Sequence, residues 1–374
     1  MKRILILLFS LFVLTGCPDY RELTDMAIAS SIGLDIKDGN YNVIVHVLDA
    51  KKTGEKDVSP NIKIYESSGK TLHEALRKIV LESPQKLYVG HLNSFVISES
   101  FAKEGISKIF DFILRDSEVE KSFNLIVTKN NINEIMNINN SDSNVPLQDI
   151  SKSIDLSTNI EGSTSSITFD RFIESVMKIG IDPVLPVILI KDEDDKKTIS
   201  LDEQIAIFKD DKLVSYLNKD NTFIYNLLNN NLSSSVFSFK CDKSNYGSIE
   251  ILDYSSNYYY DFDLNKIITE VDIISSLSEL NCNMNIENNK TMDEIENKIK
   301  NELSKNINNF FNEIKKSESD ILGIEQYIYR NNYLFYEKNK NNISELLSNS
   351  EMDLNVNITI EQIGSLKKGN EKID

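Results

Sequence analysis

The stretch MAIASSIGLDIKDGNYNVIVHVLD, residues 26–49, predicts the kind of fold that this chain adopts. Its first part, 26–35, is small and apolar, and its second part, 41–49, alternates between apolar and polar residues. Three valines of the second part share one face: Val43, Val45 and Val47. A period of two is typical of a β-strand, and Lys37-Asp38-Gly39-Asn40 is a turn sequence. The stretch therefore predicts two strands of a sheet.

Strand and helix patterns alternate through the next hundred residues. Short apolar runs predict strands at 63–67, 90–98 and 123–128, and helical spacing predicts helices after Thr71, at 104–115 and at 132–136. Thr71-x-x-Glu74 is a capping box, in which a hydroxyl and a carboxylate satisfy free amides at a helix start. This alternation favours an α+β or α/β layer over a helical bundle.

The middle of the chain contains its clearest interior run of charges. Helices are predicted at 147–159 and 168–179, and an apolar strand follows two prolines and ends near Ile190. Lys191–Lys197 reads KDEDDKK and is predicted to be a loop or linker. A calcium site is the alternative, but the run lacks the spaced oxygens and the glycine of a calcium loop. Residues 199–217 then predict a small hairpin around Lys209–Lys212.

The last third predicts strands followed by long helices. A short helix is expected at 223–228, and strands at 236–284 with turns at 243–245 and 255–257. Thr291 is expected to open the longest helix through a second capping box with Glu294. Its apolar stripe predicts packing onto a sheet, because its polar face carries mixed charge and not the basic excess of a membrane-surface helix. A second helix at 321–339 and a strand at 354–360 complete the prediction.

At the other end, the first seventeen residues predict export. Lys2 and Arg3 precede the apolar run Ile4–Leu14, which is typical of a secretory signal and too short to span a bilayer. The run ends Leu14-Thr15-Gly16-Cys17, which suits a bacterial signal peptidase that cleaves before a lipid-modified cysteine. We therefore expect residues 1–16 to be a signal peptide and Cys17 to carry acyl chains that hold the mature chain at a membrane. A chance apolar start is the alternative.

Composition narrows the class of protein further. The 374 residues suggest two or three domains, and 58 acidic against 41 basic residues give a net charge of −17. This acidity excludes nucleic-acid binding and attachment to anionic lipid by charge alone. In an exported chain Cys241 and Cys282 could form a disulfide, although two buried free thiols are the pattern that we favour from sequence. No other apolar stretch approaches the length of a membrane span.

The sequence shows no catalytic or metal-binding pattern. His46, His73 and His91 are isolated, and none has the spacing of a metal site. No Cys-x-x-Cys pair, Gly-x-Ser-x-Gly elbow or phosphate-binding glycine loop is present. Tyr258-Tyr259-Tyr260 could stack on a ligand, but strand packing explains it more simply. We therefore expect no enzyme activity, cofactor or metal.

The order of several short segments is more informative. They are Asp19-Tyr20-Arg21-Glu22-Leu23, Ala27–Ala29 with Ile32-Gly33-Leu34-Asp35, Gly90-His91-Leu92 through Gly105-Ile106 to Arg115-Asp116, Asp182–Val187, Ala206–Val214 and Asp320–Gly323. In this order they resemble the Ger(x)C family, the lipoprotein C subunits of nutrient germinant receptors in spore-forming bacteria. The chain departs from the family in having Pro18 after the lipid-modified cysteine, Gln204 and Ser215 near the usual hairpin glycines, and no tryptophan.

The resemblance implies an elongated, multi-domain α+β lipoprotein with mixed sheets packed against helices. It also implies a non-enzymatic subunit on the outer face of the spore inner membrane, held by palmitate-type acylation of Cys17, that assembles with two integral-membrane receptor subunits and is needed for spore germination. We expect an N-terminal α+β domain at 17–190, a small middle domain at 198–230 and a C-terminal α+β domain with long helices at 235–374. The alternative is a solute-binding or other cell-envelope lipoprotein, but the long C-terminal helices fit its two-lobed architecture poorly.

Overall fold

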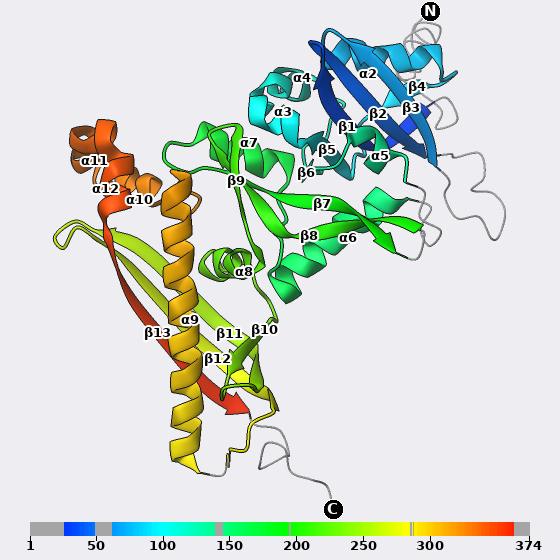
Figure 1. The fold of residues 1–374 in the computed structure, drawn as a ribbon. Helices are drawn as coiled ribbons and strands as arrows, with labels where there is room; N and C mark the ends of the chain where they lie inside the picture. Colours follow the sequence, from blue (N-terminus) through cyan, green and yellow to red (C-terminus); the bar gives the residue numbers. More distant parts are fainter. Residues whose placement is uncertain are drawn as a thin grey trace, which may run out of the picture.

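The chain forms an elongated, multi-domain α+β molecule built on two sheets (Figure 1). The computed structural model describes residues 26–48, 62–138, 145–193, 196–284, 286 and 288–362. The predicted signal peptide and Cys17 lie outside these residues. Within the described residues, no helix has both the length and the apolar character needed to cross a membrane.

The first sheet has nine strands in the order β3-β2-β1-β5-β6-β7-β8-β9, with β4 also paired to β1. The central strands β1, β5, β6 and β7 run parallel, and antiparallel strands extend the sheet on both sides. The strands are β1 (Met26–Lys37), β2 (Asn40–Leu48), β3 (Ile62–Gly69), β4 (Lys86–Tyr88), β5 (Ser94–Ser98), β6 (Asn124–Thr128), β7 (Val184–Glu193), β8 (Lys196–Lys209) and β9 (Lys212–Leu217).

Helices cover both faces of this sheet. They are α2 (Leu72–Lys78), η3 (Ile79–Leu81), α3 (Glu99–Glu104), η4 (Ile106–Ile109), α4 (Phe110–Arg115), α5 (Ile132–Met136), α6 (Pro146–Leu156), the π-helical turn η5 (Ser157–Glu161) and α7 (Phe169–Met177). One core lies under α2–α4 and α7, and a second lies under α5 and α6. Because both faces are covered, every residue of β5 and β6 is buried.

The second sheet has four strands in the order β10-β11-β12-β13. They are β10 (Val236–Lys240), β11 (Tyr246–Asp261), β12 (Lys266–Leu280) and β13 (Glu351–Gln362), and β13 is parallel to β12. The long helix α9 (Asn289–Ser317) runs along this sheet, and α10 (Ile324–Asn331), α11 (Tyr333–Asn339), η6 (Lys340–Asn342) and α12 (Ile343–Asn349) gather at one end (Figure 1). The apolar stripe of α9 packs into the core of this sheet, as its helical spacing predicts.

The segment 198–230 links the two sheets and does not form a small domain of its own. Strands β8 and β9 belong to the first sheet, whereas α8 (Lys219–Leu228) lies against α9 and β11 of the second unit. Ile205 and Ile207 of β8 share one core with α8, α9 and the second sheet. The hairpin predicted at 199–217 is confirmed, but the sequence could not show which sheet the hairpin joins.

The structure differs from the sequence prediction at several local points. The KDEDDKK run is mostly strand, because β7 continues to Glu193 and β8 begins at Lys196. Helix α9 begins at Asn289 and is capped by Asn288, so Thr291 lies inside it. Residues 321–339 form two helices, because Gly323, with a φ of 71°, precedes α10 and Asn332 separates α10 from α11. The predicted turn at 255–257 is part of β11, where pairing with β12 continues.

The two cysteines differ from the favoured sequence reading. Cys241 and Cys282 form a disulfide and are not free thiols, and both are buried. Their Cα atoms are 6.2 Å apart, within the range that a disulfide bridges. Sequence spacing did not indicate this proximity, which arises because β10 and β12 lie on either side of β11. The bond ties the segment after β10 to the segment after β12.

Candidate functional site

Three of the segments that carry the family resemblance meet where the two sheets join. Asp182 precedes β7, Lys209 ends β8 and Asp210 follows it in the β8–β9 turn, and Asp320 follows α9. The amide of Asp182 donates a hydrogen bond to the carbonyl of Asp320 at 2.9 Å, and the hydroxyl of Ser319 donates to the carbonyl of Phe208 at 2.6 Å. We call this meeting point of residues 182, 209–210 and 319–320 the joint.

The carboxylate of Asp182 holds the joint together. It is 6% exposed and accepts hydrogen bonds from the Lys209 ammonium at 2.9 Å and from the backbone amides of Asp210 and Asp320 at 2.8 Å each. Burial lowers the pKa of Lys209, but the hydrogen bond and charge of Asp182 outweigh burial and raise that pKa. One buried anion thus connects the first sheet to the end of α9.

The carboxylate of Asp320 fixes the helix that follows. Its two oxygens accept hydrogen bonds from the first amides of α10, those of Ile324 at 3.0 Å and Glu325 at 2.7 Å. Burial raises the pKa of Asp320 to about 6, the nearby charge of Asp182 adds to that rise, and the two amides oppose it. A negative group at a helix N-terminus is favourable, so α10 holds this carboxylate in place despite its burial.

Close backbone contact completes this side of the joint. The amide of Gln326 donates to the carbonyl of Gly180 at 2.9 Å. Gly180 has a φ of 74°, and a Cβ atom at that position would lie 2.5 Å from the amide nitrogen of Gln326. A glycine is therefore required for α10 to approach the segment before β7.

The β8–β9 turn also contacts the opposite side, where α3 ends. The Asp211 carboxylate accepts a hydrogen bond from the amide of Ser107 at 2.9 Å. The backbone carbonyl of Asp211 accepts another from the amide of Ile106 at 3.0 Å. Gly105 has a φ of 117°, and a Cβ there would lie 2.7 Å from Asp211 Oδ2. A fourth resemblance segment, 90–116, therefore reaches the same turn.

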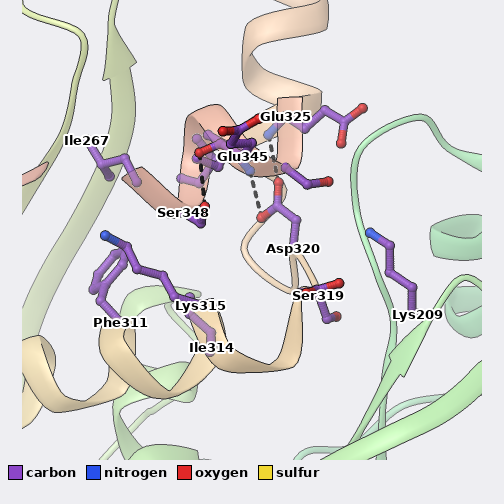
Figure 2. Close-up of a pocket in the computed structure, with 14 residues that line it drawn as sticks. Lys209, Ile267, Phe311, Ile314, Lys315, Ser319, Asp320, Glu325, Glu345 and Ser348 are labelled. Atoms are coloured by element: carbon purple, nitrogen blue, oxygen red, sulfur yellow. Dashed lines mark hydrogen bonds between the residues drawn. The ribbon is translucent and has the colours of Figure 1, made fainter. Parts of the chain in front are cut away.

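A cavity of about 470 Å³ opens beside the joint. It lies between the end of α9, the segment 318–325 and α12, and Lys209 faces it from the end of β8 (Figure 2). Its lining combines buried apolar side chains of α9 with several carboxylates. Burial raises the pKa of one of these, Glu325, while the charge of Lys209 opposes that rise.

The histidines lie in three unrelated environments. His46 is buried and its Nε2 lies 2.6 Å from the carbonyl oxygen of Met136, while burial lowers its pKa against the effect of that carbonyl. His73 stacks on Phe112, and His91 contacts Tyr88 edge to face. Among the described residues, no three or more His, Cys, Asp or Glu side chains are grouped to hold a metal ion.

Two side chains of the tyrosine run, Tyr258 and Tyr260, make contacts inside the protein, whereas Tyr259 is partly exposed. Tyr260 is 1% exposed, and the hydroxyl of Tyr258 donates to the carbonyl of Leu322 at 2.9 Å and lies 3.1 Å from Asn229 Oδ1. Strand packing, the simpler interpretation from sequence, therefore accounts for these side chains. Sequence reasoning missed the joint, because no local pattern indicates that Asp182 contacts a residue 138 positions later.

The segments at the joint belong to two recognised domain types. Residues 19–190 match the Spore germination protein N-terminal domain, and residues 203–364 match the Spore germination B3/GerAC-like C-terminal domain. Together these matches cover most of the chain. The chain therefore belongs to the Ger(x)C family of spore germination proteins, as its segments suggested.

Individual relatives agree with this assignment over nearly the whole length. The chain is 25% identical to Spore germination protein KC of Bacillus subtilis (strain 168) over 361 residues, which cover 90% of this chain and 88% of that protein. It is 23% identical to Spore germination protein GerQC of Bacillus cereus over 333 residues, covering 87% and 89% of the two chains. The crystal structure of the GerBC protein shares its fold, with a TM-score of 0.54 and 14% identity over 93% of this chain and 100% of the other.

Proposed function

We propose that this chain is the lipoprotein C subunit of a nutrient germinant receptor and is needed for spore germination. Acylated Cys17 holds it on the outer face of the spore inner membrane, where it assembles with two integral-membrane subunits. The observation that carries the proposal is the presence of both germination-protein domains, in order, across residues 19–190 and 203–364. The names of the relatives add support, since B. subtilis Spore germination proteins A3 and B3 are among them.

The proposed role is structural and involves no catalysis. The joint gives the subunit a fixed geometry, because Asp182 bonds to both sheet-bearing halves at once. The chain can therefore present surfaces of both sheets to its partners in one orientation. The acyl chains supply the attachment, because an acidic protein gains little from anionic lipid.

The test is co-purification from spore inner membranes with a tagged wild-type chain and a tagged Cys17→Ala variant. We expect the wild type to bring down two multi-span proteins, and the variant to lose them because an unanchored chain cannot assemble. Mass spectrometry of the mature N-terminus checks acylation of Cys17 in the same sample. Recovery of the wild type alone would overturn the proposal, and recovery with a permease and an ATPase would support a solute-binding lipoprotein instead.

A further inference from the structure

The cavity beside the joint has the volume and the apolar lining that are typical of a small-molecule site. Its volume of about 470 Å³ lies within the roughly 300–1,000 Å³ common for such sites. Three apolar side chains form part of the lining, and each is buried: Ile267 is 3%, Phe311 3% and Ile314 8% exposed. These side chains leave little of their own surface in water, so an apolar body would contact the apolar wall that they form together with the partly exposed Leu347.

The charges around the cavity are unequal. Four carboxylates line it, those of Glu318, Asp320, Glu325 and Glu345, against the ammonium groups of Lys209 and Lys315. The imbalance is larger than this count, because Lys209 is already paired with Asp182 at 2.9 Å. Negative charge therefore exceeds positive charge at the surface that a ligand would meet.

The other charged side chains that line the cavity differ in whether they have a hydrogen-bond or ion-pair partner in the protein. Lys315 donates a hydrogen bond to the carbonyl of Ser350 at 2.7 Å. Across the described residues, the carboxylates of Glu318 and Glu345 make no hydrogen bond or ion pair. Figure 2 shows Glu345 and Glu325 on the same side of the cavity, with Phe311 and Lys315 on the other.

We propose that this cavity binds a small organic cation, an ammonium or amidinium group carried on an apolar body. The charged group lies among Glu325, Glu345 and Asp320, and the apolar body covers Phe311 and Ile314. An apolar floor suits an organic body better than a hydrated inorganic ion, because it offers no oxygen ligands. The site goes beyond the proposed assembly role, which does not require it.

The lining also connects the ligand to the joint. Lys209 belongs to the first sheet, Glu325 to α10 and Glu345 to α12. A ligand held between these elements stabilises their present arrangement, since a molecule that binds only the folded form raises its stability by mass action. Binding is therefore expected to raise the temperature at which the joint opens.

The experiment measures binding of hexylammonium to the purified full chain in a non-ionic detergent, by calorimetry and thermal unfolding. Hexanoate and 1-hexanol have the same apolar body with a negative charge or none. We expect saturable one-to-one binding of hexylammonium with a Kd of about 1 mM or below and a rise in Tm. Hexanoate and hexanol should not bind in this range.

Matched variants separate the cavity from net charge. Glu345→Gln and Glu325→Gln should each weaken hexylammonium binding about three- to tenfold, since each removes one charge-assisted contact. Glu134→Gln makes the same change of charge in α5 of the first sheet and should leave the Kd unchanged. Unfolding curves without ligand check that each variant is folded.

Three results would overturn the proposal. They are the absence of saturable hexylammonium binding, equal binding of hexanoate or hexanol, and equal weakening by Glu134→Gln and Glu345→Gln. The last result would reduce the effect to a general attraction between an acidic protein and a cation. Loss of co-purifying subunits in the Cys17→Ala experiment would leave this proposal unaffected, because the two tests measure different surfaces.

Discussion

The two sheets of this protein use their side chains in opposite ways. In the first sheet, helices cover both faces and every residue of β5 and β6 is buried. In the second, α9 covers one face, and the burial of β12 and β13 alternates along the strands. The comparison shows that a continuous apolar run and an alternating run both encode strands, and that the difference between them reports how many faces are covered.

Polar side chains occupy the exposed positions of the second sheet, and some of them bind backbone amides at its edges. The outward positions of β13 include Glu351, Asp353 and Asn355. Two glutamates of α9 also satisfy edge amides: Glu302 accepts from Lys240 of β10 at 2.8 Å, and Glu296 accepts from Ile360 of β13 at 2.9 Å. Such contacts reduce the tendency of an edge strand to pair with other chains.

The largest expected effect tests the comparison directly. Leu125→Ala and Ile126→Ala, adjacent in β6, should each lower the free energy of unfolding by about 2–5 kcal/mol, because both side chains are 0% exposed. In β12, Ile273→Ala should cost about as much, but the exposed Glu270→Ala should change stability by less than about 0.5 kcal/mol. Denaturant unfolding measures all four. A harmless substitution at either position of β6 would contradict two-sided burial.

The next effect concerns the disulfide of the second unit. The bond closes a loop with a sequence separation of 41, which the chain-entropy model values at about 4 kcal/mol. Cys241→Ser with Cys282→Ser should therefore lower the unfolding free energy of the second unit by about 2–4 kcal/mol. Hydrogen exchange, which resolves the two sheets, provides the measurement. Equal loss of protection in both sheets would show that the units unfold together and would weaken the contrast between them.

A third prediction separates the joint from both sheets. Asp182→Ala should lower the free energy of unfolding by about 2–3 kcal/mol, because the amides of Asp210 and Asp320 lose their acceptor and Lys209 loses its partner. Asp111→Ala removes a carboxylate that pairs with Arg115 on an exposed helix face, and it should cost less than about 1 kcal/mol. Chemical denaturation of the two variants gives the comparison. Similar small losses would mean that the Asp182 network does not hold the halves together.

The smallest effect is a pH dependence of the joint. The folded-state pKa of Asp320 is about 6, above the ordinary value of 3.8, so the folded state binds more protons between about pH 4 and 6. Its contribution to stability therefore increases as the pH falls through this window, by about 1 kcal/mol between pH 7 and pH 5.

Asp320→Asn checks that sign. The variant loses one acceptor for the amides of α10 at every pH. The gain in the free energy of unfolding from pH 7 to pH 5 should be smaller in the variant than in the wild type, because the asparagine does not titrate. Thermal unfolding across this range provides the measurement. An unchanged pH dependence would show that Asp320 titrates near its ordinary value.

Local patterns predicted most elements but not how distant ones meet. Thr71 caps α2 as expected, with its hydroxyl accepting from the amide of Glu74 at 3.1 Å. The alternation in 354–360 identified β13, but nothing local indicated that it pairs in parallel with β12. Gly323 was assigned to a helix interior because its positive φ is a property of the folded turn and not of its neighbours.

The candidate site was the least predictable part for the same reason. Asp182, Lys209 and Asp320 each lie in a segment that resembles the family, but no sequence pattern indicates that these distant residues contact one another. The number of acidic residues, 58, could not indicate that the carboxylates of Asp182 and Asp320 are the two that meet at the joint. The disulfide was hidden in the same way, since only the strand order brings Cys241 near Cys282.

The position of β13 has a consequence for the order in which the parts of the chain fold. The first sheet is complete at Leu217, whereas β12 lacks its parallel neighbour until residues 351–362 have followed. Contacts of such high sequence separation form slowly, and until they form the edge of β12 and the apolar stripe of α9 lack part of their cover. The stage before residues 351–362 pair with β12 is therefore the period when this protein is most exposed to aggregation.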